Sequence, residues 1–169
     1  LIGTHARDKD AIVATMALCE AAAYYKTKGM TLWDAMVAMY EKYGYYKDDI
    51  QSITLKGIEG LAKIQEIMTT LRDNTPAQIG EHKVLKARDY KKDTITDLET
   101  GAVTPTGLPN SNVLYYELPD AAWVCFRPSG TEPKLKFYYG VKADTMEAAD
   151  AKAAELGAAV MAIVEPMLG

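Results

Sequence analysis

Histidine and cysteine are scarce in this sequence, and each occurs only twice among 169 residues. Cys19 and Cys125 are too few for the disulfide framework of a small secreted domain, and apolar neighbours surround both, so we expect two reduced core residues. The histidines, His5 and His82, stand far apart, and no Cys/His cluster has the spacing of a zinc site. The sequence therefore predicts no metal site within this chain.

The sequence also lacks an apolar run of about 18 residues and a recognisable signal peptide. We therefore expect no membrane span, no membrane partner and a cytoplasmic location. Apolar residues make up 49% and charged residues 25%, a balance typical of a soluble globular protein with a real core. No initiator methionine precedes Leu1, from which we expect a truncated or proteolysed piece of a longer protein.

The net charge of −4 argues against a nucleic-acid partner, because nucleic-acid-binding domains usually carry a basic face. One short segment departs from this balance. Residues 127–136 contain three cations and one acid, which is a local charge of +2. A basic loop on an acidic chain indicates a small anionic ligand bound locally.

This basic segment has the features of a rigid loop between two strands. Apolar, strand-like residues precede it, and after it the pattern alternates with a period of two over residues 134–142. Pro128 and Pro133 restrict the backbone at both ends. Gly130 permits either an unusual backbone angle or a close approach that a Cβ would block.

Side chains suited to phosphate gather on the same loop. Ser129 and Thr131 offer hydroxyls, consecutive N–H groups can form an anion nest, and Arg127 can bind two phosphate oxygens at once. Lys134 and Lys136 add positive potential. The alternative is an ordinary tight turn with a solvated charge run, but this combination within eight residues favours a phosphate cradle.

Hydrophobic periodicity and breaker residues predict the remaining elements. We expect helices over residues 8–28, 31–43, 57–72 and from 144 onward, and strands at 53–55, 83–90, 113–118, 121–126 and 134–142. Residues 45–52 are expected to be a linker, and residues 91–110 a long exposed loop whose role the sequence does not indicate. The order of strand, helix, strands in series and helix predicts an α+β fold, with helices packed on one face of a mainly antiparallel sheet.

Each of these helices has an apolar stripe. In the first it is Ile12, Met16, Cys19 and Ala23, and alone the first two helices are expected to expose their apolar faces. In the third the expected buried stripe is Ile58, Leu61, Ile64 or Gln65, Met68 and Leu71. The head of the first helix also carries His5, Arg7 and Lys9. A helix N-terminus with cationic neighbours can bind an anion, but the spacing alone favours a solvated turn in which Lys9 pairs with Asp8, Asp10 or an acid elsewhere.

The run RPSGTEPK followed by LKFYY resembles the phosphate-binding loop of the α-D-phosphohexomutases, the phosphoglucomutase/phosphomannomutase superfamily. The resemblance implies that the loop lies in the fourth, C-terminal domain, which has a TATA-binding-protein-like layout, and that it grips the phosphate of a bound sugar phosphate. Position by position, it assigns the phosphate contacts to Arg127, Ser129, Gly130, Thr131 and Lys136, with Lys134 as an active-site neighbour.

The run GTHARDKDA resembles the segment just downstream of the sugar-specificity loop in domain three of the same enzymes. Lys9 takes the place of a lysine that faces the active site, so the resemblance makes it a candidate for contacting substrate or aiding proton transfer, with His5 and Arg7 as neighbours. It also implies two parts: residues 1–44 as the C-terminal helices of an incomplete α/β domain three, and residues 45–169 as domain four.

The activity that the resemblance implies is that of an intramolecular phosphotransferase, an isomerase of carbohydrate metabolism. Such enzymes interconvert hexose 1-phosphate and hexose 6-phosphate through a hexose 1,6-bisphosphate, using a phosphoserine and Mg²⁺. Their serine loop and Asp-x-Asp-x-Asp metal loop belong to the first two domains, and neither motif occurs in this sequence. We therefore expect a fragment that is inactive alone and has the sugar phosphate and domains one to three as its partners.

The sugar is not encoded in the residues present. Glucose is preferred to mannose because the GTHARDKD segment and the long last domain resemble the long phosphoglucomutases. The alternative function is a stand-alone, non-catalytic phosphate-binding module.

Overall fold

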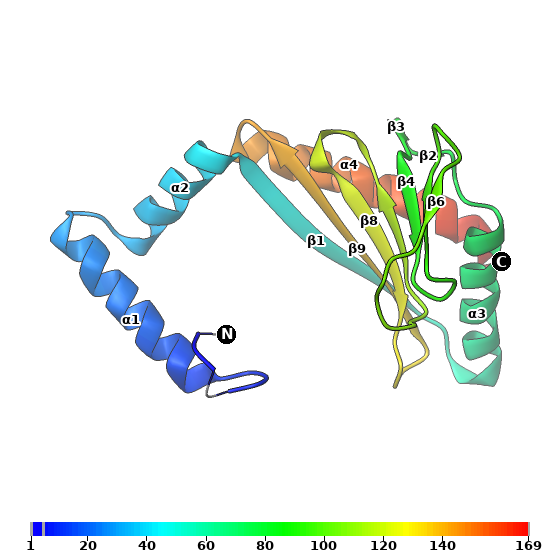
Figure 1. Cartoon of the computed structure of the whole chain (residues 1–169), viewed down its shortest axis with the longest axis horizontal. Helices are drawn as coiled ribbons and strands as arrows, with labels where there is room; N and C mark the ends of the chain where they lie inside the picture. Colours follow the sequence, from blue (N-terminus) through cyan, green and yellow to red (C-terminus); the bar gives the residue numbers. More distant parts are fainter. Residues whose placement is uncertain (1, 5, 169) are drawn as a thin grey trace. The chain divides into compact units, whose positions relative to one another are not determined.

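The computed structural model describes residues 2–4 and 6–168 and divides the chain into two compact units, Leu1–Gly44 and Tyr45–Gly169 (Figure 1). His5, a predicted active-site neighbour, lies outside the described residues. Each unit is considered separately below.

The first unit begins with helix α1 (Ala11–Thr27), whose N-cap is Asp10. The Asp10 carboxylate accepts a hydrogen bond from the Val13 amide at 3.0 Å, which satisfies one of the free donors at the helix start. The apolar stripe of this helix, Ile12, Met16, Cys19 and Ala23, is exposed in this unit, as expected for the helix without the rest of its domain, and the half-buried positions are Val13, Ala17, Ala21, Ala22 and Tyr25. The core position expected for Cys19 is therefore wrong for this unit. The helix is rich in alanine and apolar on every side, so its pattern does not single out one face.

Helix α2 (Leu32–Tyr43) begins with a capping box formed by Thr31 and Asp34. The Thr31 hydroxyl accepts from the Asp34 amide at 3.1 Å, and the Asp34 carboxylate accepts from the Thr31 amide at 2.8 Å. The helix ends at Gly44, which has a positive φ of 104°. Neither α1 nor α2 contains a fully buried residue, so this unit has no core of its own within the described residues.

The second unit is an antiparallel sheet of seven strands in the order β1-β9-β8-β7-β4-β5-β6, with helices against one face (Figure 1). The strands are β1 (Tyr45–Thr54), β4 (Lys86–Asp89), β5 (Thr94–Asp97), β6 (Val103–Thr104), β7 (Leu114–Glu117), β8 (Trp123–Pro128) and β9 (Lys134–Ala143). A separate two-stranded sheet pairs β2 (Gln78–Ile79) with β3 (His82–Lys83), and the helices are α3 (Gly57–Asp73), α4 (Met146–Val164) and the short 3₁₀ turns η1 (Pro119–Ala121) and η2 (Glu165–Met167). The predicted α+β fold class is confirmed.

The inner face of the sheet forms the core with α3 and α4. The alternation predicted for β9 is confirmed, because Leu135, Phe137, Tyr139 and Val141 are all at most 3% exposed. Helix α4 contributes Ala149, Ala153, Leu156, Gly157, Val160 and Val164. Since these side chains fill one face, the alternate positions of β7, β8 and β9 form the opposite, outer face of the sheet.

The buried stripe expected for α3 is only partly right. Ile58 is 87% exposed and Leu61 48% exposed, whereas Ile64, Met68 and Leu71 are buried as predicted. The buried set also includes Gly60 and Ile67. A Cβ on Gly60 would overlap the Leu55 carbonyl group, so the first turn of the helix lies close to the chain at Leu55. The buried face runs through Gly60, Ile64, Ile67, Met68 and Leu71, and Ile58 lies on the opposite side of the helix.

Two stretches expected to lack regular structure are strands. Residues 45–52, expected as a linker, belong to β1, which pairs with β9 from Tyr45↔Ala143 to Thr54↔Lys134. Residues 91–110 contain β5 and β6, which extend the far edge of the sheet. Both stretches lie at sheet edges, where few side chains are buried and the apolar alternation that marks a strand is weak. No helix in the described part of the chain is long and apolar enough to cross a membrane.

Candidate anion-binding site

The basic loop joins β8 to β9 and is closed by its own backbone. The Ser129 amide donates to the Lys134 carbonyl at 2.8 Å, and the Lys134 amide donates to the Glu132 carbonyl at 2.7 Å. The Pro133 carbonyl accepts from the Leu55 amide at 2.9 Å, which ties the loop to the residue after β1. These three backbone hydrogen bonds constrain the conformation of the loop.

Backbone N–H groups converge inside the loop. The Ser129 hydroxyl oxygen accepts from the amides of Thr131 and Glu132, at 3.4 and 3.3 Å. Consecutive amides that point at one oxygen have the geometry of an anion nest. Gly130 has no positive φ, and a Cβ built on it would meet nothing within 4 Å. Of the two reasons considered for this glycine, an unusual backbone angle is therefore not required, and no protein atom approaches closely enough to exclude a Cβ.

Two cations stand side by side next to these amides. Arg127 on β8 and Lys136 on β9 are direct cross-strand partners and share the outer face of the sheet. Neither forms an ion pair with any residue that the structure describes. Like charges directly opposite each other in a sheet are destabilising. An anion between them would relieve this repulsion and make charge-assisted hydrogen bonds with both.

These groups line one pocket of about 290 Å³, which we call the cradle. It is formed by Arg127, Pro128, Ser129, Gly130, Thr131, Lys136 and Tyr138. The structure thus brings together the five residues that the sequence assigned to phosphate. Tyr138 was not among them, although its position two residues after Lys136 on the same strand face is a usable signal.

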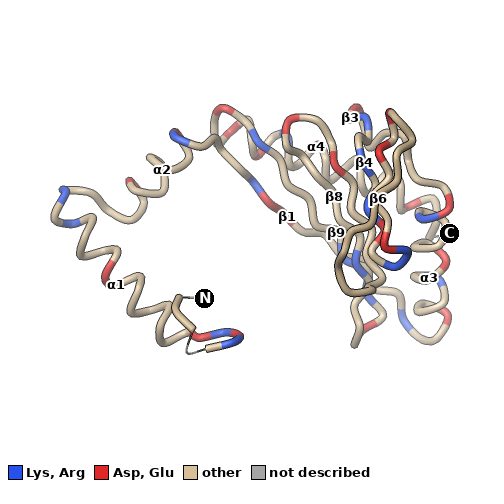
Figure 2. Tube along the Cα trace, viewed as in Figure 1, with Lys and Arg blue, Asp and Glu red and all other residues tan. Residues whose placement is uncertain are grey.

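Lys134 is placed differently from the other predicted cations. Its ammonium group pairs with the Glu132 carboxylate at 3.3 Å, and it does not line the cradle. The positive potential at the cradle therefore comes chiefly from Arg127 and Lys136. Basic and acidic residues are otherwise interspersed along both units (Figure 2), which makes this cluster a local feature.

A second pocket of about 480 Å³, which we call the side pocket, adjoins the cradle and shares Arg127 with it. Its lining is Tyr90, Leu108, Pro109, Ser111, Val113, Tyr115, Cys125 and Arg127. Burial raises the pKa of the Cys125 thiol to about 11, although the nearby Arg127 charge acts in the opposite direction. Cys125 therefore presents a neutral thiol to this pocket near pH 7.

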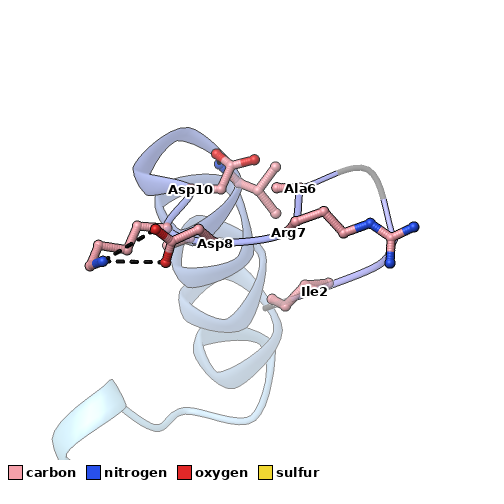
Figure 3. A pocket seen from close by; sticks show the side chains of 8 residues that line it. Ile2, Ala6, Arg7, Asp8 and Asp10 are labelled. Atoms are coloured by element: carbon pink, nitrogen blue, oxygen red, sulfur yellow. Dashed lines mark hydrogen bonds and ion pairs between the residues drawn. The ribbon is translucent and has the colours of Figure 1, made fainter.

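The head of α1 surrounds a pocket of about 540 Å³, lined by Ile2, Ala6, Arg7, Asp8, Lys9, Asp10, Val13 and Ala14 (Figure 3). The Lys9 ammonium group lies 3.2 Å from the Asp8 carboxylate, with both side chains more than four-fifths exposed. Arg7 points away from Asp8 and Asp10 (Figure 3). Within this unit, Lys9 is thus in a solvated, paired turn.

A metal ion has no evident place in the described residues. They contain no group of three or more His, Cys, Asp or Glu side chains arranged to hold one. The donor set that a divalent cation such as Mg²⁺ prefers, several converging oxygen ligands, is therefore not supplied by this part of the chain.

The similar proteins found by sequence and by structure are phosphoglucomutases. No protein-family model matches the chain. A phosphoglucomutase from Staphylococcus aureus (strain bovine RF122 / ET3-1) is 38% identical over 136 residues, which are 80% of this chain and 24% of the relative. A phosphoglucomutase from Staphylococcus epidermidis (strain ATCC 35984) is 36% identical over 138 residues, 82% of this chain and 25% of the relative. The chain thus spans about a quarter of the length of the curated relatives it matches.

One solved structure with a similar fold is the open form of the exocytosis-sensitive phosphoprotein pp63/parafusin, a phosphoglucomutase from Paramecium. The TM-score is 0.58 with 20% sequence identity, and the match covers 95% of this chain and 28% of the other. At this identity the likeness supports the fold.

Proposed function

Because the chain belongs to the phosphohexomutase superfamily and corresponds to a C-terminal part of its members, we propose that its cradle binds the phosphate group of a hexose phosphate. The observation that carries this proposal is the cross-strand pair of Arg127 and Lys136, which have no acidic partner among the described residues. The adjacent amides of Thr131 and Glu132 supply neutral donors to the same anion.

In the whole enzyme the cradle holds the phosphate that does not react. Its binding energy orients the sugar so that the hydroxyl at the far end meets the reacting group. The bisphosphate intermediate then turns around, so the cradle must accept either end of the hexose. A site that recognises phosphate through Arg127, Lys136 and backbone amides, with no requirement for one particular carbon atom, suits both orientations.

The chemical step belongs to other parts of that enzyme. We propose that domains one to three supply the phosphoserine and the ligands for Mg²⁺, since the described residues do not fit a metal. Residues 1–44 are then the C-terminal helices of domain three, and Lys9 is an active-site residue only once that domain is complete. Met16, Trp33 and Tyr43 are large apolar side chains with exposed fractions of 66%, 60% and 58%. Their exposure supports the proposal that further protein covers this unit in the whole enzyme.

Glucose is the proposed sugar, because the similar proteins are named phosphoglucomutases. The overall reaction is interconversion of glucose 1-phosphate and glucose 6-phosphate through a bisphosphate. We place the enzyme in the cytoplasm, where a charged sugar phosphate is retained. The alternative function is a stand-alone phosphate-binding module. It predicts that the source gene encodes no serine loop upstream of Leu1, whereas the enzyme requires one, so the sequence of the gene distinguishes the two functions.

Titration of the ¹⁵N-labelled chain with inorganic phosphate tests the cradle. We expect shifts of the Ser129, Gly130 and Thr131 amide signals, and loss of these shifts in Arg127→Ala. Lys83→Ala, which removes an exposed cation on β3 outside the cradle, is the matched control and leaves them unchanged. Loop amides that stay unmoved at tens of millimolar phosphate would disprove the proposal.

The chain alone should not catalyse the reaction, because the proposed phosphoserine and metal site belong to the other domains. A coupled assay of the purified 169 residues with glucose 1-phosphate checks this expectation. Turnover of glucose 1-phosphate to glucose 6-phosphate by this chain would contradict it.

A further inference from the structure

The loop that forms the cradle contains one acid, Glu132, among the cations of residues 127–136. The Glu132 amide donates to the Ser129 hydroxyl oxygen at 3.3 Å, so this residue stands among the donors proposed for the anion. A carboxylate accepts the same charge-assisted hydrogen bonds as a phosphate oxygen does. The loop therefore carries a competitor for its own ligand, and the position of the Glu132 carboxylate decides whether the cradle is available.

The Glu132 carboxylate pairs with a cation that lies outside the cradle. Its Oε2 atom is 3.3 Å from Lys134 Nζ, and neither residue lines the cradle. Arg127 and Lys136, which do line it, form no ion pair with any of the residues that the structure describes. Of the cations near Glu132 in the sequence, Lys134 alone is thus neutralised by it.

The cations of the cradle are close alternatives for this carboxylate. Lys134 and Lys136 are two positions apart on β9, so their side chains leave the same face of the strand about 7 Å apart. Arg127 is the direct cross-strand partner of Lys136. Since the side chain of Glu132 turns about several staggered bonds, its carboxylate can exchange Lys134 for the two like charges of the cradle, which attract it strongly.

The backbone of Lys134 is firmly placed for holding Glu132. The Lys134 amide donates to the Glu132 carbonyl at 2.7 Å, and the Lys134 carbonyl accepts from the Ser129 amide at 2.8 Å. Lys134 also pairs with Thr54 on β1. The Lys134 ammonium group therefore reaches Glu132 from a fixed starting point, which lowers the conformational entropy that the ion pair costs.

We propose that Lys134 is a positioning residue that keeps the cradle available to phosphate by holding the Glu132 carboxylate outside it, an inference that rests on the function proposed above. Without Lys134, the Glu132 carboxylate pairs with Arg127 and Lys136, and phosphate has to displace it. The affinity for phosphate then falls in proportion to the fraction of molecules whose cradle is unoccupied by Glu132. Lys134 thus acts on the ligand through Glu132 and makes no contact with the ligand itself.

Titration of ¹⁵N-labelled variants with inorganic phosphate, followed at the amides of residues 129–131, tests this role. Lys134→Gln should weaken phosphate binding about fivefold, the value for a competitor that fills the cradle about four-fifths of the time. Lys134→Arg keeps the cation and should bind like the parent chain. A double variant with Lys134→Gln and Glu132→Gln should recover the parent affinity, because it lacks the competitor.

The chain offers a matched ion pair as a control. Lys63 and Glu66 on α3 are 3.2 Å apart, with side chains 30% and 65% exposed, compared with 28% and 56% for Lys134 and Glu132. Lys63→Gln removes the same charge from a similar pair outside the cradle and should leave phosphate binding unchanged. A fivefold loss in Lys63→Gln would assign the effect to net charge and would refute the proposal.

The side-chain signal of Arg127 separates displacement of Glu132 from a simple loss of positive potential. Without phosphate, the Arg127 Nε–H signal should shift in Lys134→Gln as the carboxylate reaches the guanidinium group, and this shift should be absent from the double variant. An unmoved Arg127 signal, a parent-like affinity in Lys134→Gln or a double variant that stays weak would each overturn this inference alone. Loop amides of the parent chain that ignore phosphate would overturn the proposed function as well.

Discussion

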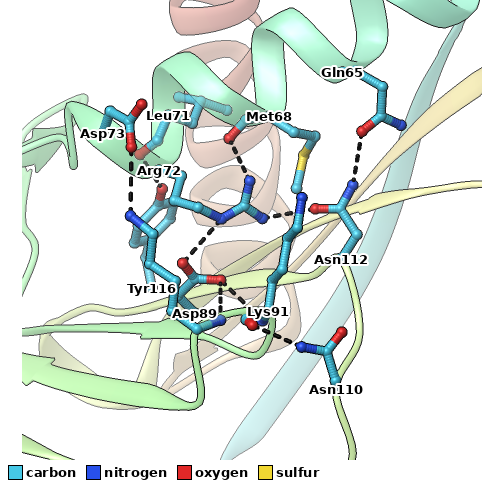
Figure 4. Close-up of polar contacts among 11 residues, drawn as sticks. Gln65, Met68, Leu71, Arg72, Asp73, Asp89, Lys91, Asn110, Asn112 and Tyr116 are labelled. Carbon is cyan, nitrogen blue, oxygen red and sulfur yellow. Dashed lines mark hydrogen bonds and ion pairs between the residues drawn. The ribbon is translucent and has the colours of Figure 1, made fainter.

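Arg72, in the last turn of α3, and Asp89, at the end of β4, form an ion pair with a distance of 2.9 Å between Nε and Oδ2 (Figure 4). The other Asp89 oxygen accepts from the amides of Lys91 and Lys92, at 3.0 and 3.3 Å. Arg72 also donates to the Met68 carbonyl at 3.2 Å. The pair therefore connects a helix, a strand and the start of the next turn through bonds largely shielded from water.

Removing one partner of this pair should be costly. Arg72→Met leaves the Asp89 carboxylate buried without its cation, and we expect a loss of about 3–5 kcal/mol in the free energy of unfolding. Lys92→Met, which breaks the exposed pair of Lys92 with Asp73, should cost less than about 1 kcal/mol. Urea denaturation of both variants provides the measurement. Similar losses in the two would show that burial does not set the strength of the Arg72 pair.

Arg127→Ala in the full-length enzyme should lower kcat/KM for glucose 1-phosphate by about 100-fold, which corresponds to about 2.7 kcal/mol. The expected cause is loss of a charge-assisted contact to the phosphate that positions the substrate. Arg127 is exposed, so the variant should retain its thermal stability. Steady-state kinetics of Arg127→Ala, with Lys83→Ala as the control variant, measures the effect. An unchanged kcat/KM in Arg127→Ala would show that Arg127 does not contact the substrate phosphate.

Two glycine substitutions should affect different properties: Gly130→Ala the affinity for phosphate, and Gly60→Ala the stability of the fold. A Cβ on Gly130 meets nothing within 4 Å, so Gly130→Ala should change stability by less than about 0.5 kcal/mol while weakening phosphate binding. A Cβ on Gly60 would overlap the Leu55 carbonyl group, so Gly60→Ala should cost about 1–3 kcal/mol of stability. Unfolding curves and phosphate titrations distinguish them. Undiminished phosphate affinity in Gly130→Ala would mean that no ligand approaches this backbone.

The hydrogen bonds that Asp93 accepts from Thr106 and Gly107 should contribute a pH-dependent part of the stability. Hydrogen bonds from the Thr106 hydroxyl and the Gly107 amide lower the pKa of Asp93 below its ordinary value. The ionised form therefore stabilises the fold above about pH 4, the unfolded pKa of aspartate, and this contribution is lost as pH falls through the lower folded pKa. Asp93→Asn tolerates the positive φ of 54° at this position and removes only the charge.

Melting temperatures of the parent chain and Asp93→Asn, recorded from pH 7 to pH 2, test this effect. The difference should be present at neutral pH and should vanish toward pH 2, where the parent Asp93 is protonated too. A difference that persists unchanged at pH 2 would assign the effect to geometry alone.

The two cysteines should react with iodoacetamide at very different rates. Cys19 is exposed, whereas burial raises the pKa of Cys125 to about 11. At pH 7.5 only about 1 in 3,000 Cys125 thiols would be ionised, and the thiolate is the nucleophile. In a Cys19→Ser chain, labelling of Cys125 followed by mass spectrometry should be slow and should accelerate about tenfold per pH unit up to pH 9. Rapid labelling at pH 7.5 would contradict its burial.

The parts of the fold that could be predicted from the sequence are those with strong local signals. The alternation in β9 and the breakers around residues 127–134 located the two central strands and the loop between them. Residues 45–52 of β1, together with β5 and β6, were missed. β1 and β6 are the edge strands and β5 contains no fully buried residue, so none of them needs a clear apolar alternation. The α3 stripe was partly misassigned because the buried face begins at Gly60, which has no apolar side chain to mark it, whereas the apolar Ile58 and Leu61 are exposed.

The candidate site also has features that a local motif predicts and features that depend on contacts distant in the sequence. Its five predicted phosphate contacts lie within ten residues of sequence, so one motif identified them. That Arg127 stands opposite Lys136 depends on strand register. The position of residues 108–113, several of which line the side pocket, depends on hydrogen bonds from Arg72 to Asn112 and from the Thr106 amide to Asp93. These bonds span 40 and 13 residues, and no local sequence pattern contains such pairs.

The Ser129 hydroxyl oxygen accepts hydrogen bonds from the amides of Thr131 and Glu132. Under the proposed function, this hydroxyl oxygen lies where an oxygen atom of the bound phosphate would accept from the same two amides. Both contacts are long, at 3.4 and 3.3 Å, so a charged oxygen can displace the hydroxyl at small cost and form shorter bonds. Once displaced, the hydroxyl is free to rotate and donate its own proton to the ligand. Under the proposed function, a single serine can therefore hold the loop backbone in shape and also donate a hydrogen bond to the bound phosphate.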